Sequence, residues 1–150
     1  MSFANRVKKE LAQFTRSPPP GITAGPIGDD LTQWQATVQG PAGSPYEGGL
    51  IKILIHLPEN YPFQAPQFNT TPPVYHPNVD QKNGIPCIES LTKQWAPNTL
   101  ISKLLIEFQE VLKNPDPSHS VEDEIGKEFM ENRQEFERKA REWTQKNAKP

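Results

Sequence analysis

The chain has 150 residues, a net charge of −2 and one cysteine. This length predicts a single domain over residues 1–150 that buries a core without disulfides or metal ions. One cysteine cannot form an internal disulfide or a cysteine-rich zinc site, and no apolar stretch reaches the roughly 20 residues of a membrane helix. The weak charge argues against a nucleic-acid partner, and the absence of an N-terminal apolar signal favours a reducing cytoplasmic or nuclear location.

The N-terminal residues 2–15 are predicted to form an amphipathic helix. Phe3, Val7, Leu11 and Phe14 recur at helical spacing and define its apolar face. Four charged residues lie off that face, namely Arg6, Lys8, Lys9 and Glu10. The proline-rich run that follows ends the helix.

Four strands are predicted in the next part of the chain. Residues 22–26 are compatible with a short edge strand, residues 33–39 alternate apolar and polar side chains, and residues 51–57 place isoleucines on one face. Residues 67–70 form a weaker fourth strand. Because no helix-length segment separates these strands, we expect a four-stranded antiparallel meander sheet.

The second half of the chain predicts a long loop and then helices. The apolar residues from Pro72 to Asn98 show neither helical nor strand spacing, and such a long irregular stretch inside a compact domain is usually functional. Residues 100–112 carry a wide apolar stripe and predict a buried central helix. A capping box over residues 120–123 predicts the start of a third helix, and Asn132 the start of a fourth. Strands followed by helices indicate an α+β fold.

The single cysteine, Cys87, lies in the long loop. A free cysteine is often a small buried apolar residue, but the neighbouring Gly84 and Pro86 place this one in irregular backbone, where reactive side chains are over-represented. We therefore treat Cys87 as a candidate nucleophile.

Four polar residues are candidates for a role beside Cys87. The side-chain amide of Asn78 can donate a hydrogen bond to an oxyanion, although His76-Pro77-Asn78 is equally compatible with a simple turn. His76, Glu89 and His119 can each accept or steer a proton, and each taken alone is more often an ordinary polar residue.

Several short motifs occur in a fixed order: Tyr61-Pro62-Phe63, His76-Pro77-Asn78, Gly84, Cys87, Trp95-Ala96-Pro97 and Asn114-Pro115-Asp116-Pro117. This order and spacing resembles the catalytic core of ubiquitin-conjugating enzymes of the minimal type, and the resemblance covers nearly the whole chain. It implies that Cys87 accepts ubiquitin as a thioester from an activating enzyme. It also implies that Asn78 shapes the loop and steadies the oxyanion.

The resemblance further implies the partners. With a RING, HECT or RING-between-RING ligase, ubiquitin would pass to a lysine of a protein substrate or to a ligase cysteine. No cofactor is expected, because ATP is used upstream by the activating enzyme. A monomer is the expected state.

The resemblance also places binding surfaces on the chain. Ligase docking is expected at Asn5, Arg6, Phe63, Pro97 and Asn98, and the activating enzyme is expected to overlap this surface at Lys9. A folded-back ubiquitin would lie along the central helix, on Thr99, Lys103, Ile106 and Glu110, although these residues also fit a solvated helix face. Thr23 falls where some members of the family bind a second, non-covalent ubiquitin, so the resemblance places a further contact there.

The sequence departs from the family pattern at His119, where many lysine-directed members carry aspartate. An unperturbed histidine becomes cationic below about pH 6.5 and would then repel an ammonium group. We therefore expect direct transfer to lysine to be weakened more than transfer to cysteine, with Glu89 offsetting part of the loss. Asn5 and Asn98 also depart from the common residues, so they leave ligase choice open.

Three alternatives are weighed against ubiquitin conjugation. SUMO-type members have an insertion after the cysteine loop, which the spacing from Cys87 to Trp95 lacks, so ubiquitin is favoured over another ubiquitin-like modifier. Non-catalytic ubiquitin-binding variants typically lack the cysteine. A cysteine hydrolase would pair Cys87 with His76 or His119, but the sequence supplies no credible oriented pair.

Overall fold

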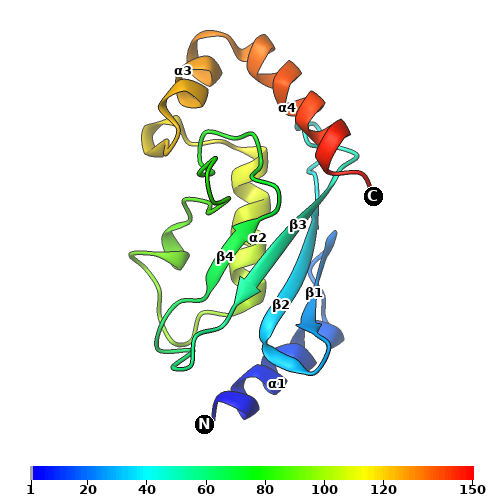
Figure 1. Ribbon diagram of the computed structural model, residues 1–150, viewed down its shortest axis with the longest axis vertical. Helices are drawn as coiled ribbons and strands as arrows, with labels where there is room; N and C mark the ends of the chain where they lie inside the picture. The colour runs from blue at the N-terminus through cyan, green and yellow to red at the C-terminus, as the bar shows by residue number, and fades with distance from the viewer. Residues whose placement is uncertain (1) are drawn as a thin grey trace.

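The protein is described by a computed structural model that covers residues 2–150 (Figure 1). The elements in chain order are α1 (Phe3–Arg16), β1 (Ile22–Ile27), β2 (Asp30–Gln39), β3 (Leu50–His56), β4 (Gln67–Thr70), the 3-10 turn η1 (Glu89–Leu91), α2 (Ile101–Lys113), the 3-10 turn η2 (Pro117–His119), α3 (Asp123–Glu131) and α4 (Arg133–Asn147). The predicted α+β fold, with one N-terminal helix, four strands and later helices, is confirmed.

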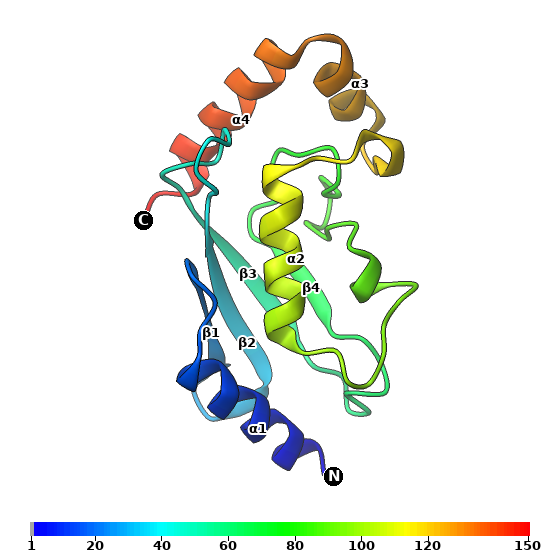
Figure 2. The same cartoon turned by 180° about the vertical axis from the view of Figure 1, so that it is seen from behind.

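The four strands form one antiparallel sheet in the order β1-β2-β3-β4. Trp34, Ala36 and Val38 of β2 pair with Ile55, Ile53 and Ile51 of β3, and all six side chains are buried. Because side chains alternate along a strand, this register turns one apolar face of the sheet inward. Figure 2 shows α2 crossing that face, with α1 at one end of the molecule and the α3–α4 pair at the other.

Helix α1 differs from its prediction at Glu10. The sequence pattern places Glu10 off the apolar face, but its side chain is only 6% exposed. Glu10 Oε1 accepts a hydrogen bond from the Ile101 N–H at 2.8 Å, and Oε2 accepts bonds from Arg6 Nε and the Tyr61 hydroxyl. Leu100, the residue that caps α2, supplies no side-chain acceptor. Glu10 therefore satisfies one of the unpaired N–H groups at the start of α2 from another helix.

The predicted capping box at residues 120–123 is wrong. Helix α3 begins at Asp123, and its cap residue Glu122 makes no side-chain capping bond. The Ser120 hydroxyl instead donates to the carbonyls of Pro77 and Glu122, and Glu122 Oε2 accepts from the Gln81 N–H at 3.0 Å. These side chains therefore tie the start of α3 to the loop before Cys87. The prediction at the next helix is confirmed, because the Asn132 side chain caps α4.

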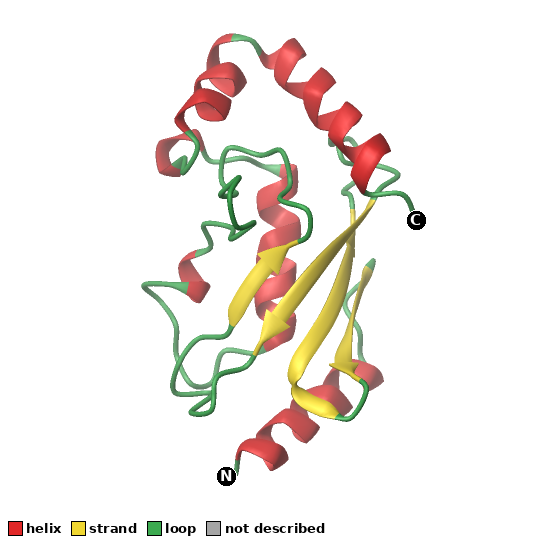
Figure 3. Ribbon diagram, in the orientation of Figure 1, coloured by secondary structure: helices red, strands yellow, loops and turns green. Residues whose placement is uncertain are grey.

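The segment from Pro72 to Asn98 is irregular, as predicted. Within it the structure contains η1 and one isolated bridge between Val79 and Pro86, and Figure 3 shows the remainder as loop beside α2 and β4. Among residues 2–150 no helix combines the length and apolar character that crossing a membrane requires.

Candidate active site

Cys87 opens into a cavity of about 310 Å³. Residues distant in sequence line it: Asn78 from the loop before the cysteine, Glu89 from η1, Glu107 from α2, and His119 from η2. The fold therefore gathers the sequence-predicted Cys87, Asn78, Glu89 and His119 around one space.

The backbone around Cys87 is held by two local features. The Cys87 N–H donates to the Asn78 carbonyl at 2.7 Å, which joins the cysteine to the opposite arm of its loop. Gly84 adopts a left-handed backbone with a φ of 75°, and a Cβ there would lie 2.2 Å from the Thr70 carbonyl oxygen. Only glycine fits this close approach. Cys87 itself is partly exposed.

Asn78 fixes the loop that faces Cys87. Its side chain is buried, and Nδ2 donates to the carbonyls of Asp116 at 2.8 Å and His119 at 3.1 Å. Oδ1 accepts the Asp116 N–H at 2.8 Å. Both amide hydrogens are thus engaged within the protein, which makes loop shaping the role that this arrangement supports. A bond to an oxyanion would require one of these contacts to be exchanged.

His76 holds the backbone of Asn78 by a hydrogen bond, and it does not line the Cys87 cavity. Its side chain is fully buried, Nδ1 accepts the Asn78 N–H at 2.9 Å, and Nε2 lies 2.8 Å from the Val111 carbonyl. Since Nδ1 is an acceptor, Nε2 carries the proton of a neutral ring. Burial lowers the pKa of His76 to about 4. The expectation that His76 handles a proton at Cys87 is therefore corrected: both ring nitrogens are committed to backbone groups.

His119 forms a pair with Asp116 at the rim of the cavity. His119 Nδ1 lies 2.7 Å from Asp116 Oδ2, and the Ser118 hydroxyl donates to Asp116 Oδ1 at 2.6 Å. Hydrogen bonds from Ser118 and His119 lower the pKa of Asp116. Within residues 2–150 no hydrogen bond links the thiol of Cys87 to a histidine, so the structure contains no formed cysteine–histidine dyad.

The cavity carries more carboxylates than the sequence-predicted Glu89 alone. Glu107, Glu110 and Asp116 also line it. Glu107 accepts from the Ser90 hydroxyl and Glu110 from the Asn114 amide, both at 2.6 Å. The four acids favour cationic groups near Cys87. Sequence reasoning missed Glu107, which looks like any other helix acid, and it quoted Asp116 only as part of the Asn114-Pro115-Asp116-Pro117 motif, without a role at the cavity.

The residues predicted to dock a ligase gather near one end of α1. Asn5, Pro97 and Asn98 are exposed, and the Phe63 side chain is 75% exposed. Lys9, predicted to contact the activating enzyme, is exposed on the same helix as Asn5.

Arg6 differs from these neighbours, because its guanidinium is used inside the protein. It donates to the carbonyls of Pro97 at 2.6 Å and Thr99 at 3.0 Å, and it pairs with Glu10. Trp95 adds a second tie, because its indole N–H donates to the Pro62 carbonyl next to Phe63. The two loops predicted to dock a ligase, one carrying Phe63 and the other Pro97 and Asn98, are therefore tied to the rest of the protein by these hydrogen bonds.

The predicted ubiquitin-contacting residues divide between exposed and buried positions. Lys103, Ile106 and Glu110 form an exposed row on α2. Thr99 does not share that row: it precedes α2, is 5% exposed, and its hydroxyl accepts the Ala96 N–H. Thr23 is exposed on β1, where its hydroxyl bonds that of Thr37 across the strand pair.

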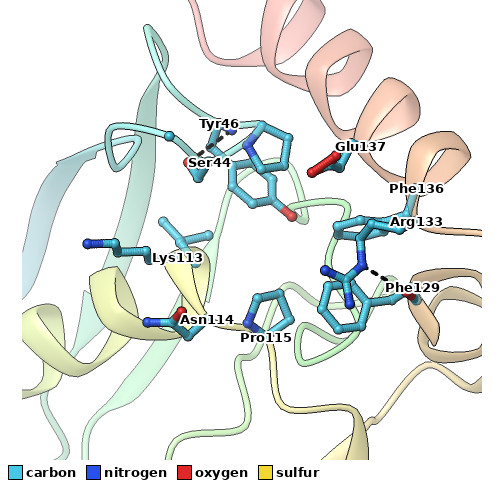
Figure 4. Close-up of a pocket in the computed structure, with 12 residues that line it drawn as sticks. Ser44, Tyr46, Lys113, Asn114, Pro115, Phe129, Arg133, Phe136 and Glu137 are labelled. Carbon is cyan, nitrogen blue, oxygen red and sulfur yellow. Dashed lines mark hydrogen bonds between the residues drawn. The ribbon is translucent and has the colours of Figure 1, made fainter.

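A second cavity of about 300 Å³ lies between the β2–β3 loop, the end of α2 and the α3–α4 pair (Figure 4). The Arg133 guanidinium stands over the Phe129 ring, 3.6 Å from its centroid, and its Nε donates to the Phe129 carbonyl. None of the residues lining this cavity is a cysteine or histidine. It therefore offers no nucleophile comparable with Cys87.

Two comparisons with known proteins agree with this geometry. The family model described as ubiquitin-conjugating enzyme matches residues 6–144. A solved structure of a Toxoplasma gondii ubiquitin-conjugating enzyme E2 domain superposes with a TM-score of 0.89 and 32% sequence identity, covering 97% of this chain and 99% of that one. On these grounds, the chain belongs to the ubiquitin-conjugating enzyme family.

Proposed function

We propose that this chain is an active conjugating enzyme that accepts ubiquitin from an activating enzyme as a thioester on Cys87. The observation that carries the proposal is that Cys87, the only cysteine of the sequence, is partly exposed and lines the 310 Å³ cavity together with Asn78. A second nucleophile, a lysine of a protein substrate or a cysteine of a ligase, would then attack the thioester carbonyl and release the Cys87 thiolate.

The surroundings of Cys87 suit a carrier better than a hydrolase. A hydrolase needs a base oriented on its nucleophile or on water, and such a base would shorten the life of a thioester. Within residues 2–150, no histidine is hydrogen-bonded to Cys87, and His76 is neutral, buried and turned to backbone partners. These features support transfer between partners over hydrolysis.

Ubiquitin is the proposed cargo, and another ubiquitin-like modifier is the alternative. The short spacing from Cys87 to Trp95 favours ubiquitin. A folded-back ubiquitin would rest on the exposed row of α2 formed by Lys103, Ile106 and Glu110, with Thr23 on the opposite side of the sheet as a further non-covalent contact. ATP would be consumed by the activating enzyme, so this chain needs no cofactor of its own. We further propose that it acts as a monomer in the cytoplasm or nucleus.

Charging tests this proposal. The protein, an activating enzyme, ATP and ubiquitin would be mixed and run on a non-reducing gel, with Cys87→Ala as the matched variant. We expect one adduct that disappears with added thiol and is absent from the variant. Parallel reactions with SUMO and other ubiquitin-like modifiers and their own activating enzymes identify the cargo. Charging by another modifier alone would reject ubiquitin, and charging by none would reject the conjugating activity.

Ligase docking predicts a separate effect of Phe63→Ala. Large exposed aromatic side chains commonly dominate binding energy at interfaces, so we expect ligase-stimulated discharge to fall about tenfold or more. Discharge without ligase should stay unchanged, because Phe63 does not line the Cys87 cavity. Met130→Ala is the control, since Met130 is another large exposed apolar residue, at 65% exposure, on α3. Equal behaviour of the two variants would place the docking surface elsewhere.

A further inference from the structure

The segment just after Cys87 is held by one side-chain hydrogen bond from another element. The 3-10 turn η1 begins two residues after the cysteine. Ser90 in this turn is buried, and its hydroxyl donates to Glu107 Oε1 of α2 at 2.6 Å. Within residues 2–150 this is the only hydrogen bond that joins η1 to a helix or strand. The position of η1 therefore depends on this bond and on apolar packing.

The Ser90 hydroxyl does not make the local bond that is usual for its residue type. Serine and threonine hydroxyls in helical turns commonly bond carbonyls a few residues earlier in the chain. The Thr92 hydroxyl does so, donating to the carbonyls of Ile88 at 3.3 Å and Glu89 at 3.5 Å. Ser90 instead takes the carboxylate of Glu107, and a bond to a charged acceptor is roughly twice as strong as a neutral one. The pair is therefore a specific tie between η1 and α2.

Cys87 lies between this tie and a second one. On one side, its own N–H donates to the Asn78 carbonyl at 2.7 Å. On the other side, the buried Ile88 leads directly into η1, which the Ser90–Glu107 bond holds against α2. This bond therefore limits how far the cysteine can move from the central helix.

Glu107 belongs to the part of α2 that carries the exposed row of Lys103, Ile106 and Glu110. It directly follows Ile106, and about one helical turn separates it from both Lys103 and Glu110. Glu107 lines the Cys87 cavity, whereas Ile106 is exposed. The same stretch of helix thus holds the cysteine segment on one side and presents the proposed resting surface of ubiquitin on the next.

We propose that Ser90 and Glu107 are positioning residues that set the spacing between the thioester on Cys87 and the exposed row of α2. This inference rests on the proposed function. A ubiquitin that is attached to Cys87 and rests on the row must span this spacing with the end of its chain. A displacement of about 1 Å from the productive geometry can lower a rate about a hundredfold. Loss of the bond should therefore slow the discharge of ubiquitin from Cys87 to any acceptor.

This effect differs from the effect of charge alone. Glu107 is one of four carboxylates that line the cavity, so removing its charge weakens the attraction of a lysine ammonium but not of a cysteine acceptor. Three carboxylates stay in place, so this charge effect should be small. The positioning bond acts on the attached ubiquitin, and its loss should slow both acceptors alike. Glutamine at position 107 separates the two effects, because it keeps an acceptor oxygen for Ser90 and removes the charge.

Discharge of purified, charged enzyme tests the inference. Free lysine or free cysteine would be added to the wild type, Ser90→Ala, Glu107→Ala, Glu107→Gln and the double alanine variant. We expect discharge to both acceptors to fall about fivefold in each single alanine variant. Glu107→Gln should recover most of this loss. The double variant should also fall about fivefold and not about 25-fold, because both changes remove the same bond.

Ile106→Ala supplies a readout that a merely structural bond would not change. If the bond acts through the spacing to a resting ubiquitin, it matters little once the resting surface is lost. In the Ile106→Ala background, Ser90→Ala should therefore lower discharge by less than about twofold. Ser17→Ala and Glu131→Ala are the controls, since both residues are exposed and outside the cavity, and both variants should match the wild type. Urea unfolding checks that every variant is folded under the assay conditions.

Contrary results separate the inference from the proposed function. Discharge at the wild-type rate in both Ser90→Ala and Glu107→Ala would overturn the positioning role. An undiminished effect of Ser90→Ala in the Ile106→Ala background would also overturn it, because that result indicates a disturbed cysteine loop. Equal losses in Glu107→Gln and Glu107→Ala would overturn it in favour of charge. In these cases the wild type still charges and the proposed function stands. Failure of the wild type to charge would overturn the proposed function, and this inference with it.

Discussion

Replacing Glu10 with alanine is expected to lower the free energy of unfolding by about 3–5 kcal/mol, the range seen when one partner of a buried ion pair is removed. Glu10 accepts hydrogen bonds from Arg6, Tyr61 and the Ile101 N–H. Burial and the neighbouring Glu10 carboxylate raise the pKa of Tyr61, so its hydroxyl remains a donor. Without Glu10, three donors from α1, the β3–β4 loop and the start of α2 lose their acceptor together.

Urea unfolding of Glu10→Ala, Glu10→Gln and Lys8→Ala measures this effect. Glutamine keeps the shape and one acceptor oxygen but removes the charge. The loss of stability in Glu10→Gln should therefore fall between the losses in Glu10→Ala and Lys8→Ala. Lys8 is exposed on the same helix, and its replacement should change stability by less than about 0.5 kcal/mol. A loss below about 1 kcal/mol in Glu10→Ala would show that the cluster contributes little to holding α1 on α2.

Glu10 also matters for function, because its partner Arg6 binds the carbonyls of Pro97 and Thr99. From the sequence, Arg6 is expected to be a surface contact for a ligase. In the structure its guanidinium holds, by hydrogen bonds, the loop that carries the exposed Pro97 and Asn98. Loss of ligase binding in an Arg6 variant would therefore reflect a displaced loop as well as any lost contact.

The second large effect is a loss of stability in mild acid that originates from His76. Burial lowers its pKa to about 4, whereas an unfolded histidine has a pKa near 6.5. Below about pH 6.5 the unfolded chain takes up a proton that the folded chain refuses, so stability falls as the pH falls through this window. Between about pH 7 and pH 5 we expect a loss on the order of 2 kcal/mol.

His76→Gln isolates this contribution. The variant is expected to be less stable at pH 7, because it loses the bonds to Asn78 and Val111, but its stability should decline less between pH 7 and pH 5. Asp116 and Glu135 also have lowered pKa values in the folded protein, through bonds from Ser118 and Arg138 respectively. The stability that these two carboxylates contribute is lost only at the lower pH where carboxylates titrate. This loss is the same in the wild type and in His76→Gln. If the free energy of unfolding fell equally in the wild type and in His76→Gln between pH 7 and pH 5, His76 would not be the acid-sensitive group.

Most of the fold could be predicted from the sequence, because the spacing of apolar residues follows which side chains are buried. The alternation of Trp34, Ala36 and Val38 identified the face of β2 that packs inward, and the fourth strand at residues 67–70 has the bounds predicted for it. Asn132 was identified as a helix cap because its preference for that position is local. Each of these features depends on residues close together in the chain.

Several of the features that escaped prediction depend on partners that lie far along the chain. Glu10 is hydrophilic, so hydrophobic periodicity places it on the exposed face of α1. Its carboxylate instead accepts hydrogen bonds from Tyr61 and Ile101, which lie far along the chain. Ser120 has the residue type of a cap but bonds the Pro77 carbonyl instead. Thr99 was counted with the exposed row of α2, although the turn before the helix buries it. The pairing of Asp116 with His119 depends on the tight turn that the Asn78 amide holds.

The central claim is that Cys87 carries the modifier, and intact-protein mass spectrometry after charging tests it most directly. The predicted result is a mass increase of one ubiquitin on the wild type, removed by thiol, assigned to the Cys87 peptide, and absent from Cys87→Ala. An equal increase on Cys87→Ala, or no increase with any modifier, would contradict the account.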